Sequence, residues 1–223
     1  MLPAIFLASW ATHAAWAEPN ADRQQEVEMA FDHYTAVKTE DQRIAIIDYL
    51  QHLDRKLVAG ALIDHIIASH NGNEATAFNK LVEAISPDGC AALLDRLAKT
   101  DDPVAKGKLV VALRHCPSAD SIHALTGCLE DKRPVPFESH GPHPRRVCDL
   151  AYDELFLKLR TDPRYRLDPS PHMAGVITER TPVKTRDTLI AKLKAALAAA
   201  PSPSPAPPAP APSPSAIETP KSA

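Results

Sequence analysis

Apolar residues recur at helical spacing along most of the chain. In the segment 41–53, for example, Ile44, Ile47 and Leu50 lie one turn apart, and similar stripes continue through the following segments. Apolar positions at i, i+3, i+4 and i+7 indicate helices with one buried face. The pattern predicts helices over these ranges: 22–37, 41–53, 55–69, 74–85, 87–99, 103–116, 118–129, 146–159 and 186–199.

Short clusters of proline, Asp and Ser separate the predicted helices and mark where several of them start. Asp101-Asp102-Pro103 and Pro117-Ser118-Ala119-Asp120 are two examples. An Asp or Ser side chain caps the first free amides of a helix, and proline costs nothing in the first turn because its missing N–H has no partner there. The helices come in pairs, and each pair alone leaves an apolar face exposed. Stability is therefore expected to come from stacking one pair on the next.

Two segments interrupt the helical pattern. Residues 132–145 and 161–185 each contain four prolines, and the first also contains Gly141. Proline removes a helical hydrogen bond and clashes with the preceding turn, so neither segment is expected to be helical throughout. Long loops within a compact domain are usually functional or disordered. The loop 132–145 is therefore the first place to look for a binding site.

The two ends differ from the helical part. Residues 1–17 are apolar and uncharged and end in Ala15-Trp16-Ala17, which is typical of a secretory signal peptide, although no Lys or Arg precedes the apolar stretch. Residues 201–223, rich in Pro, Ala and Ser, are expected to form a disordered tail that is a spacer or, alternatively, a tether. Between the ends, we predict a capping helix at 18–38 and a helical repeat domain at 39–200.

Charge and composition exclude several classes of partner. The formal net charge is -3, and acidic and basic residues are interspersed without a block of like charges. Nucleic-acid binding needs a clustered basic face, so no nucleic-acid partner is expected. The apolar stretch at the start is shorter than the roughly 20 residues of a membrane span. We therefore expect no integral membrane span after signal cleavage.

The four cysteines predict disulfides if the protein is exported. Cys90 begins the second helix of one pair and Cys116 ends the first helix of the next, which places both on one edge of the array. Cys128 and Cys148 lie at the opposite edge. Because the rise of a helix separates Cys116 from Cys128 by roughly 15 Å, that pair cannot be bridged. We predict the pairs Cys90–Cys116 and Cys128–Cys148; alternatively, some of these cysteines are small buried core residues.

Two histidines in the proline-rich loop are candidate metal ligands. His140 and His143 lie close to Cys148, and His and Cys are common ligands of zinc. Their spacing matches no closed structural zinc site. Metal binding through these three residues is therefore an alternative, and no metal site is assigned.

The sequence contains no recognisable catalytic motif. Nucleophile elbows, phosphate-binding glycine loops and His-Glu-x-x-His patterns are all missing from it. Asp149, Asp153 and Glu154 could supply carboxylates near the loop, but acids on a helix face are usually only solvated. We therefore predict no catalytic residue, no cofactor and no enzymatic activity.

The paired helices resemble HEAT-type repeats of bacterial exported proteins over about residues 40–160. The Asp101-Asp102-Pro103-Val104 start of one helix and the segment Arg146-Val147-Cys148-Asp149-Leu150-Ala151 carry the resemblance. It implies an all-α, HEAT-like α-solenoid of stacked helical hairpins with disordered ends, and a role in scaffolding or protein binding. The proline-rich insertion before Arg146 departs from the repeat pattern.

These observations together predict an exported protein-binding or scaffold module that is periplasmic or secreted and whose partner is another protein. The second helices of the pairs are expected to form a concave face, with the loop 132–145 at its rim. Arg and aromatic residues are enriched at interface hot spots. The residues predicted to contact the partner are Arg133, Phe137, His140, His143 and Arg145. The alternative is a metal-binding or metal-regulated periplasmic module centred on 132–148.

Overall fold

The computed structural model describes residues 19–69, 78, 81–136, 142–165, 167 and 177–200. Within these ranges the protein is helical, apart from turns, connecting segments and one pair of two-residue strands. The predicted all-α class is thereby confirmed. The predicted signal peptide at 1–17 and the predicted tail at 201–223 lie outside the described residues.

The first three helices begin and end close to the predicted positions. They are α1 (Pro19–Ala36), α2 (Glu40–His52) and α3 (Arg55–Ala68). The Asp54 side chain caps α3 by accepting a hydrogen bond from the backbone N–H of Lys56 at 2.9 Å. Helix α1 packs against α2 and α3 and contributes Val27, Phe31 and Tyr34 to the core.

The middle of the chain forms α5 (Asp88–Lys99), α6 (Pro103–Ala112) and α7 (Ala119–Cys128). Asp102 caps α6 by accepting from the N–H of Ala105 at 2.7 Å, and Pro103 lies in the first turn as predicted. The end of the predicted helix 103–116 tightens into one 3₁₀ turn, η1 (Leu113–His115). Of the predicted helix 74–85, Phe78 and residues 81–85 are described; Phe78 and residues 81–84 are helical, and Ile85 begins a turn.

The last part comprises β1 (Pro134–Val135), β2 (Arg145–Arg146), α8 (Val147–Leu159) and α9 (Val183–Ala199). The two strands pair antiparallel, with Pro134 opposite Arg146 and Val135 opposite Arg145. The described residues of the loop 132–145 are not helical, as predicted, but the hydrophobic pattern did not indicate the strand pair. The strands bring the two ends of this loop together at the start of α8.

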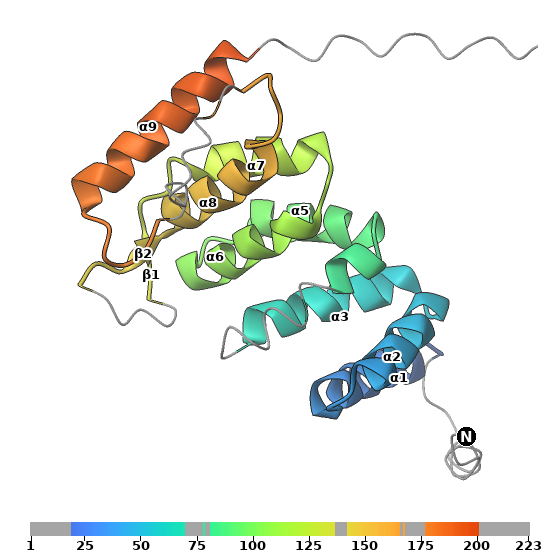
Figure 1. Cartoon of the computed structure of the whole chain (residues 1–223). Coiled ribbons are helices and arrows are strands. Elements are labelled where there is room, and N and C mark those ends of the chain that lie inside the picture. Colours follow the sequence, from blue (N-terminus) through green and yellow to red (C-terminus); the bar gives the residue numbers. More distant parts are fainter. Residues whose placement is uncertain are drawn as a thin grey trace, which may run out of the picture.

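The helices stack in chain order, from α1 and α2 at one end to α9 at the other (Figure 1). Helix α3 packs against α5 and α6, α6 packs against α8, and α8 is covered by α7 and α9. One apolar core runs through these layers, and its fully buried members include Phe31, Leu62, Leu93, Leu109, Leu125 and Leu155. Among the helices in the described ranges, none has the length and apolar content needed to cross a membrane.

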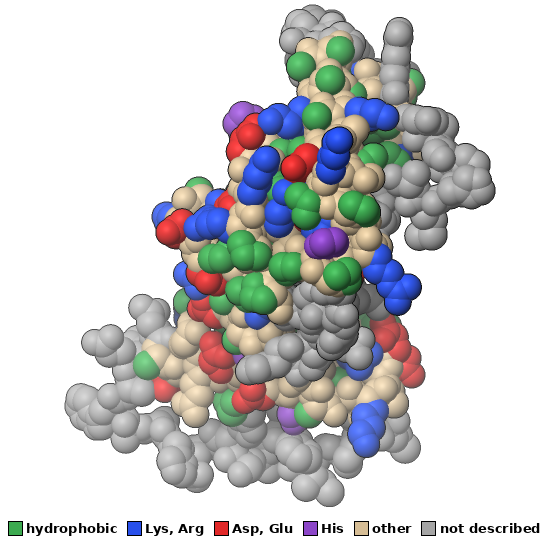
Figure 2. Space-filling view, turned by 90° about the vertical axis from the view of Figure 1, so that its left-hand side faces the viewer, with side chains coloured by type: hydrophobic (Ala, Val, Ile, Leu, Met, Phe, Trp, Pro, Cys, Tyr) green, Lys and Arg blue, Asp and Glu red, His purple; other side chains and the backbone are tan. Residues whose placement is uncertain are grey.

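Charged and apolar side chains are unevenly distributed over the surface. Figure 2 shows Lys and Arg side chains gathered over the upper part of the molecule, the level at which α9 lies in Figure 1. Among the large apolar side chains that stay exposed, Met29 belongs to α1, Ile44 and Tyr49 belong to α2, and Val183 begins α9. Three of these four side chains therefore lie on α1 and α2, and the fourth lies at the start of α9.

Candidate functional site

A buried network of arginines and carboxylates lies beside β2, at the N-terminal end of α8. Asp149, in the first turn of α8, is 0% exposed. Its carboxylate accepts from the backbone N–H of Arg146 at 2.9 Å and from the Arg146 guanidinium at 2.8 Å. Burial alone would raise the pKa of Asp149, but the hydrogen bonds from Arg146 and Arg186 outweigh it and hold the pKa below its ordinary value. The carboxylate is therefore charged and fully engaged.

Arg186 is the second centre of this network. It lies in the first turns of α9 and is 0% exposed. Its five N–H groups donate to Asp149 Oδ2 at 2.7 Å and to the carbonyl oxygens of His143 (2.9 Å), Pro144 (3.0 Å), Thr178 (3.0 Å) and Thr181 (2.8 Å). A single side chain thus ties the loop before β2, the segment 178–181 and α8 to the start of α9.

Two further acids of α8 are buried and paired. Asp153 is 5% exposed; its carboxylate accepts from the N–H of Ile177 at 2.8 Å and forms an ion pair with Arg145. Glu154 is 2% exposed and receives two hydrogen bonds of 2.7 Å from Arg114. The interpretation of the α8 acids as solvated was therefore wrong. Helix α8 is enclosed by α6, α7 and α9, which shield these acidic side chains from water. A buried carboxylate needs hydrogen-bond or ion-pair partners within the protein.

Burial changes the protonation of Asp153. It raises the pKa of this carboxyl to about 7, and the Arg145 guanidinium and the Ile177 N–H offset only part of that rise. Asp149 and Asp153 lie one turn apart on α8, and their pKa values shift in opposite directions. The difference follows from the number of donors, because Asp149 faces two arginines and a backbone N–H.

The described residues among the predicted partner contacts are engaged with their own chain. Arg133 donates to Asp131 at 2.7 Å and to Asp101 at 2.8 Å, which fastens the loop to the α5–α6 turn. Arg145 pairs with Asp153, and the carbonyl of His143 accepts from Arg186. Phe137 and His140 lie outside the described residues. The contact of this set with another protein remains a prediction.

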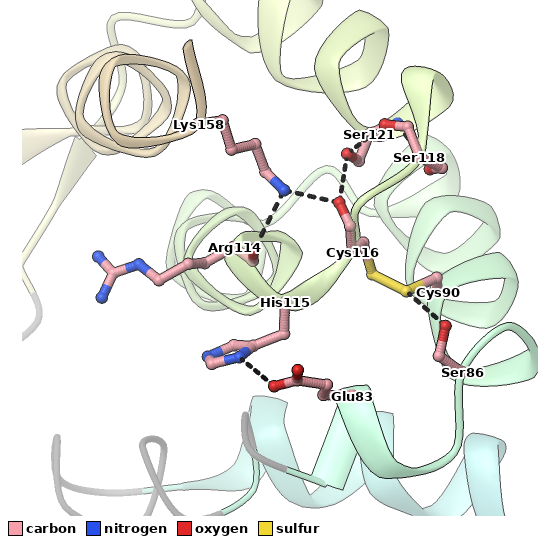
Figure 3. Close-up of a disulfide and its surroundings, with 9 residues drawn as sticks. All are labelled: Glu83, Ser86, Cys90, Arg114, His115, Cys116, Ser118, Ser121 and Lys158. Atoms are coloured by element: carbon pink, nitrogen blue, oxygen red, sulfur yellow. Dashed lines mark hydrogen bonds and ion pairs between the residues drawn. A yellow bond between two sulfur atoms is a disulfide. The ribbon is translucent and has the colours of Figure 1, made fainter. Parts of the chain in front are cut away.

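The predicted disulfide between Cys90 and Cys116 is confirmed. It joins the first turn of α5 to the residue after η1, and the two Cα atoms lie 5.5 Å apart (Figure 3). The carbonyl oxygen of Cys116 accepts from Ser121 Oγ at 2.7 Å and from Lys158 Nζ at 2.6 Å. Residues of α5, α7 and α8 therefore meet at the end of η1.

The predicted disulfide between Cys128 and Cys148 was wrong, because both cysteines are buried and free. Their side chains serve different parts of the interior. Cys128 lines a cavity of about 410 Å³ that Leu94 and Lys106 also line. The Cys148 thiol instead donates to Asp149 Oδ1 at 3.8 Å. The two thiols thus have different neighbours.

The alternative metal site gains no support from the placed residues. Burial, together with the charge of Asp149, raises the pKa of Cys148 to about 12, whereas a metal ligand must be a thiolate. His143 is half-buried in the loop, and His140 is outside the described ranges. Across the part of the chain that the structure places, no three His, Cys, Asp or Glu side chains come together as metal ligands.

The network was missed at the sequence level, although one signal pointed to it. Arg186 lies three and seven residues before Leu189 and Leu193, so it occupies the apolar stripe of its own helix. A charged residue on such a stripe is expected either to leave the core or to find a buried partner. Its partners come from three separate segments, and no local pattern identifies them.

The chain matches no model of a known protein family, and comparison with curated proteins and with solved structures found no significant match.

Proposed function

We propose that this protein is an exported scaffold module that binds another protein through the loop 132–145 and the adjoining helical surface. The observation that carries the proposal is the set of hydrogen bonds from Arg186 to the carbonyls of His143, Pro144, Thr178 and Thr181. These bonds hold two surface segments in one arrangement. A preorganised surface loses less conformational entropy when a partner binds, so more of the contact energy is available for affinity.

A recurring contact between layers supports a HEAT-like solenoid. Lys108 of α6 donates to two carbonyls at the end of α3, those of Ile67 and Ser69. Lys158 of α8 donates in the same way to the carbonyls of Arg114 and Cys116 at the end of η1 (Figure 3). A lysine at a helix C-terminus satisfies free carbonyls and complements the helix dipole. The repetition of this contact from one layer to the next favours an array of equivalent units.

The disulfide supports export. Disulfides form and persist in oxidising compartments and are rare in the cytosol. Cys90 and Cys116 are both buried, and their bridge joins two layers of the core. A periplasmic or secreted location is therefore part of the proposal, together with cleavage of the signal peptide predicted at 1–17.

Site-specific photocrosslinking in the native cells tests the binding surface. A photoreactive phenylalanine analogue at the exposed position Pro136 is expected to give an adduct of one reproducible mass with another protein. The matched control carries the analogue at Asp120, an exposed residue of α7. Adducts of equal yield at both positions, or none at Pro136, would contradict the proposal.

A further inference from the structure

The outer surface of α2 is not covered by any described element. Leu50 is its one buried residue, whereas Asp41, Ile44, Ala45 and Asp48 are exposed. These positions are three to four residues apart and form one stripe along the helix. Ile44 is 49% exposed in the middle of this stripe. We call it the α2 stripe; it combines an apolar centre with an acid on either side.

The outer surface of α9, at the other end of the stack, carries lysines and small side chains that complement the acids and the Ile of the α2 stripe. Its exposed residues include Lys184, Thr188, Ala191, Lys192 and Ala195. We call this set the α9 stripe. Its centre is formed by small side chains, on which a protruding Ile can pack, and lysines lie on either side of Thr188.

The charged side chains of the two stripes form no ion pairs within the described part of the chain, and their spacings along the two helices are similar. Within the described ranges, Asp41, Asp48, Lys184 and Lys192 take part in no ion pair. At a rise of 1.5 Å per residue, the two acids are separated by about 10 Å along α2 and the two lysines by about 12 Å along α9. Two acids on one helix can therefore meet two lysines on the other at the same time.

The net charges of the two ends of the stack are also opposite in sign. Residues 19–53 contain seven Asp or Glu and three Lys or Arg, which gives this end a net charge of -4 with histidine neutral. Residues 177–200 contain five Lys or Arg and two Asp or Glu, a net charge of +3. Without Arg186, which is buried and paired with Asp149, this net charge is +2. Lys and Arg side chains are visible in the upper part of Figure 2, at the level of α9. The stack thus has an acidic end and a basic end.

We propose that these two ends bind each other between copies of the chain, head to tail, with the α2 stripe of one copy on the α9 stripe of the next. Asp41 and Asp48 pair with the two lysines, and Ile44 packs among the small residues between them. The added copy continues the stacking of helices that already holds the layers of one chain together. Because the contact joins two different surfaces, it produces open chains of copies rather than a closed dimer.

The contact is expected to be weak and sensitive to salt. A single helix packed on another covers less than the roughly 800 Å² per partner of a standard interface. Four exposed charges are screened when the ionic strength is high. The association uses the ends of the stack and not the loop 132–145, so its failure would leave the proposed function standing.

A charge-exchange experiment tests the proposal by sedimentation velocity over a range of protein concentrations. The weight-average mass of the unmodified protein is expected to rise with concentration at an ionic strength of about 0.02 M and to fall back at about 0.5 M. One variant, D41K/D48K, then has two basic ends, and another, K184D/K192D, has two acidic ends. Each alone is expected to associate at least about tenfold more weakly, because like charges now face each other. An equimolar mixture of the two restores association.

The control variant D95K/D120K reverses two exposed acids on α5 and α7, outside both stripes, and is expected to associate like the unmodified protein. Urea midpoints of all variants check that the fold is retained. Monomers at every concentration in low salt would overturn the proposal. So would association that the reversals leave unchanged, or that the mixture does not restore, because the contact would then lie elsewhere or involve a different occupant.

Discussion

Arg186 lies on the otherwise apolar stripe of α9, and its charged side chain is fully buried. Removing a guanidinium from water costs several kcal/mol, and only complete pairing offsets that cost. Arg186 reaches this state because all five of its N–H groups have acceptors, one of them the buried Asp149. Removing it leaves both a buried carboxylate and several carbonyls short of a donor.

The variant Arg186→Gln is therefore expected to lower the free energy of unfolding by about 3 to 5 kcal/mol, the usual cost of breaking a buried ion pair. Urea denaturation measures this loss. The control is Lys192→Gln on the exposed side of the same helix, which is expected to change stability by less than about 0.5 kcal/mol. A loss below about 1 kcal/mol for Arg186→Gln would contradict the role assigned to the network.

Asp153 predicts a dependence of stability on pH that is opposite to ordinary acid denaturation. Its folded pKa is raised to about 7, above the ordinary value of about 3.9 in an unfolded chain. Between these two values the folded protein holds a proton that the unfolded chain has lost. Stability due to this group is complete below about pH 4 and falls as the pH rises toward 7, by at most about 1.4 kcal/mol per pH unit.

The variant Asp153→Asn isolates this effect, because other groups, such as His115, titrate in both proteins and cancel in the comparison. Unfolding free energies of the two proteins from pH 4 to pH 8 are expected to differ by an amount that changes through this window. The unmodified protein loses stability relative to the variant as the pH increases. A difference that is constant with pH, or that changes in the opposite direction, would show that Asp153 is ionised throughout.

At the scale of the elements, Gly107 allows α6 to approach its neighbours closely. A Cβ atom added there would lie 2.9 Å from Val135 Cγ1 in β1 and 3.0 Å from Leu150 Cδ1 in α8. Gly60, in α3, has nothing within 4 Å of the same position. The two glycines are both inside helices, so they share the same intrinsic cost of about 0.5 to 1 kcal/mol relative to alanine.

The two substitutions to alanine should therefore have opposite signs. Gly60→Ala is expected to raise the free energy of unfolding by up to about 1 kcal/mol, because only helix propensity changes. Gly107→Ala is expected to lower it by about 1 to 3 kcal/mol, since Val135 or Leu150 must move away. Thermal or urea unfolding of both variants is the measurement. If Gly107→Ala were as stabilising as Gly60→Ala, the close packing of α6 on β1 and α8 would be disproved.

At the scale of the whole molecule, the layers are joined by the apolar core and by specific contacts between sequential units. The Cys90–Cys116 disulfide bridges 26 residues and two layers. Lys108 and Lys158 each reach the end of a helix in the layer before. The disulfide also leaves Cys128 and Cys148 as free thiols, which makes the pairing directly measurable.

Thiol titration of the denatured protein, purified without reductant, is expected to find two free thiols of the four cysteines. No free thiol would show that Cys128 and Cys148 also pair, and four would exclude the Cys90–Cys116 bridge. Reduction is expected to lower the free energy of unfolding by about 3 to 4 kcal/mol, from the entropy of the loop that the bridge closes. The variant C90S/C116S should be insensitive to the reductant.

Much of the fold was predictable, because the signals of a helix come from residues close together in the sequence. The ranges 41–53 and 87–99 were predicted to within one residue at either end, since caps and apolar stripes are local signals. The first disulfide was also predictable, because it follows from where two helices begin and end. The strand pair at 134–135 and 145–146 was not, since its partners are separated by a proline-rich loop.

The helical class, most helix limits and the Cys90–Cys116 disulfide could be predicted from the amino-acid sequence, because each depends on periodicity or on where a helix ends. The packed fold was needed to show that Asp149, Asp153 and Glu154 are buried and that Arg186 joins three segments. It also separated the thiols of Cys128 and Cys148. The physical reason is that burial of a polar side chain depends on which elements pack around its helix, and those elements come from distant parts of the chain.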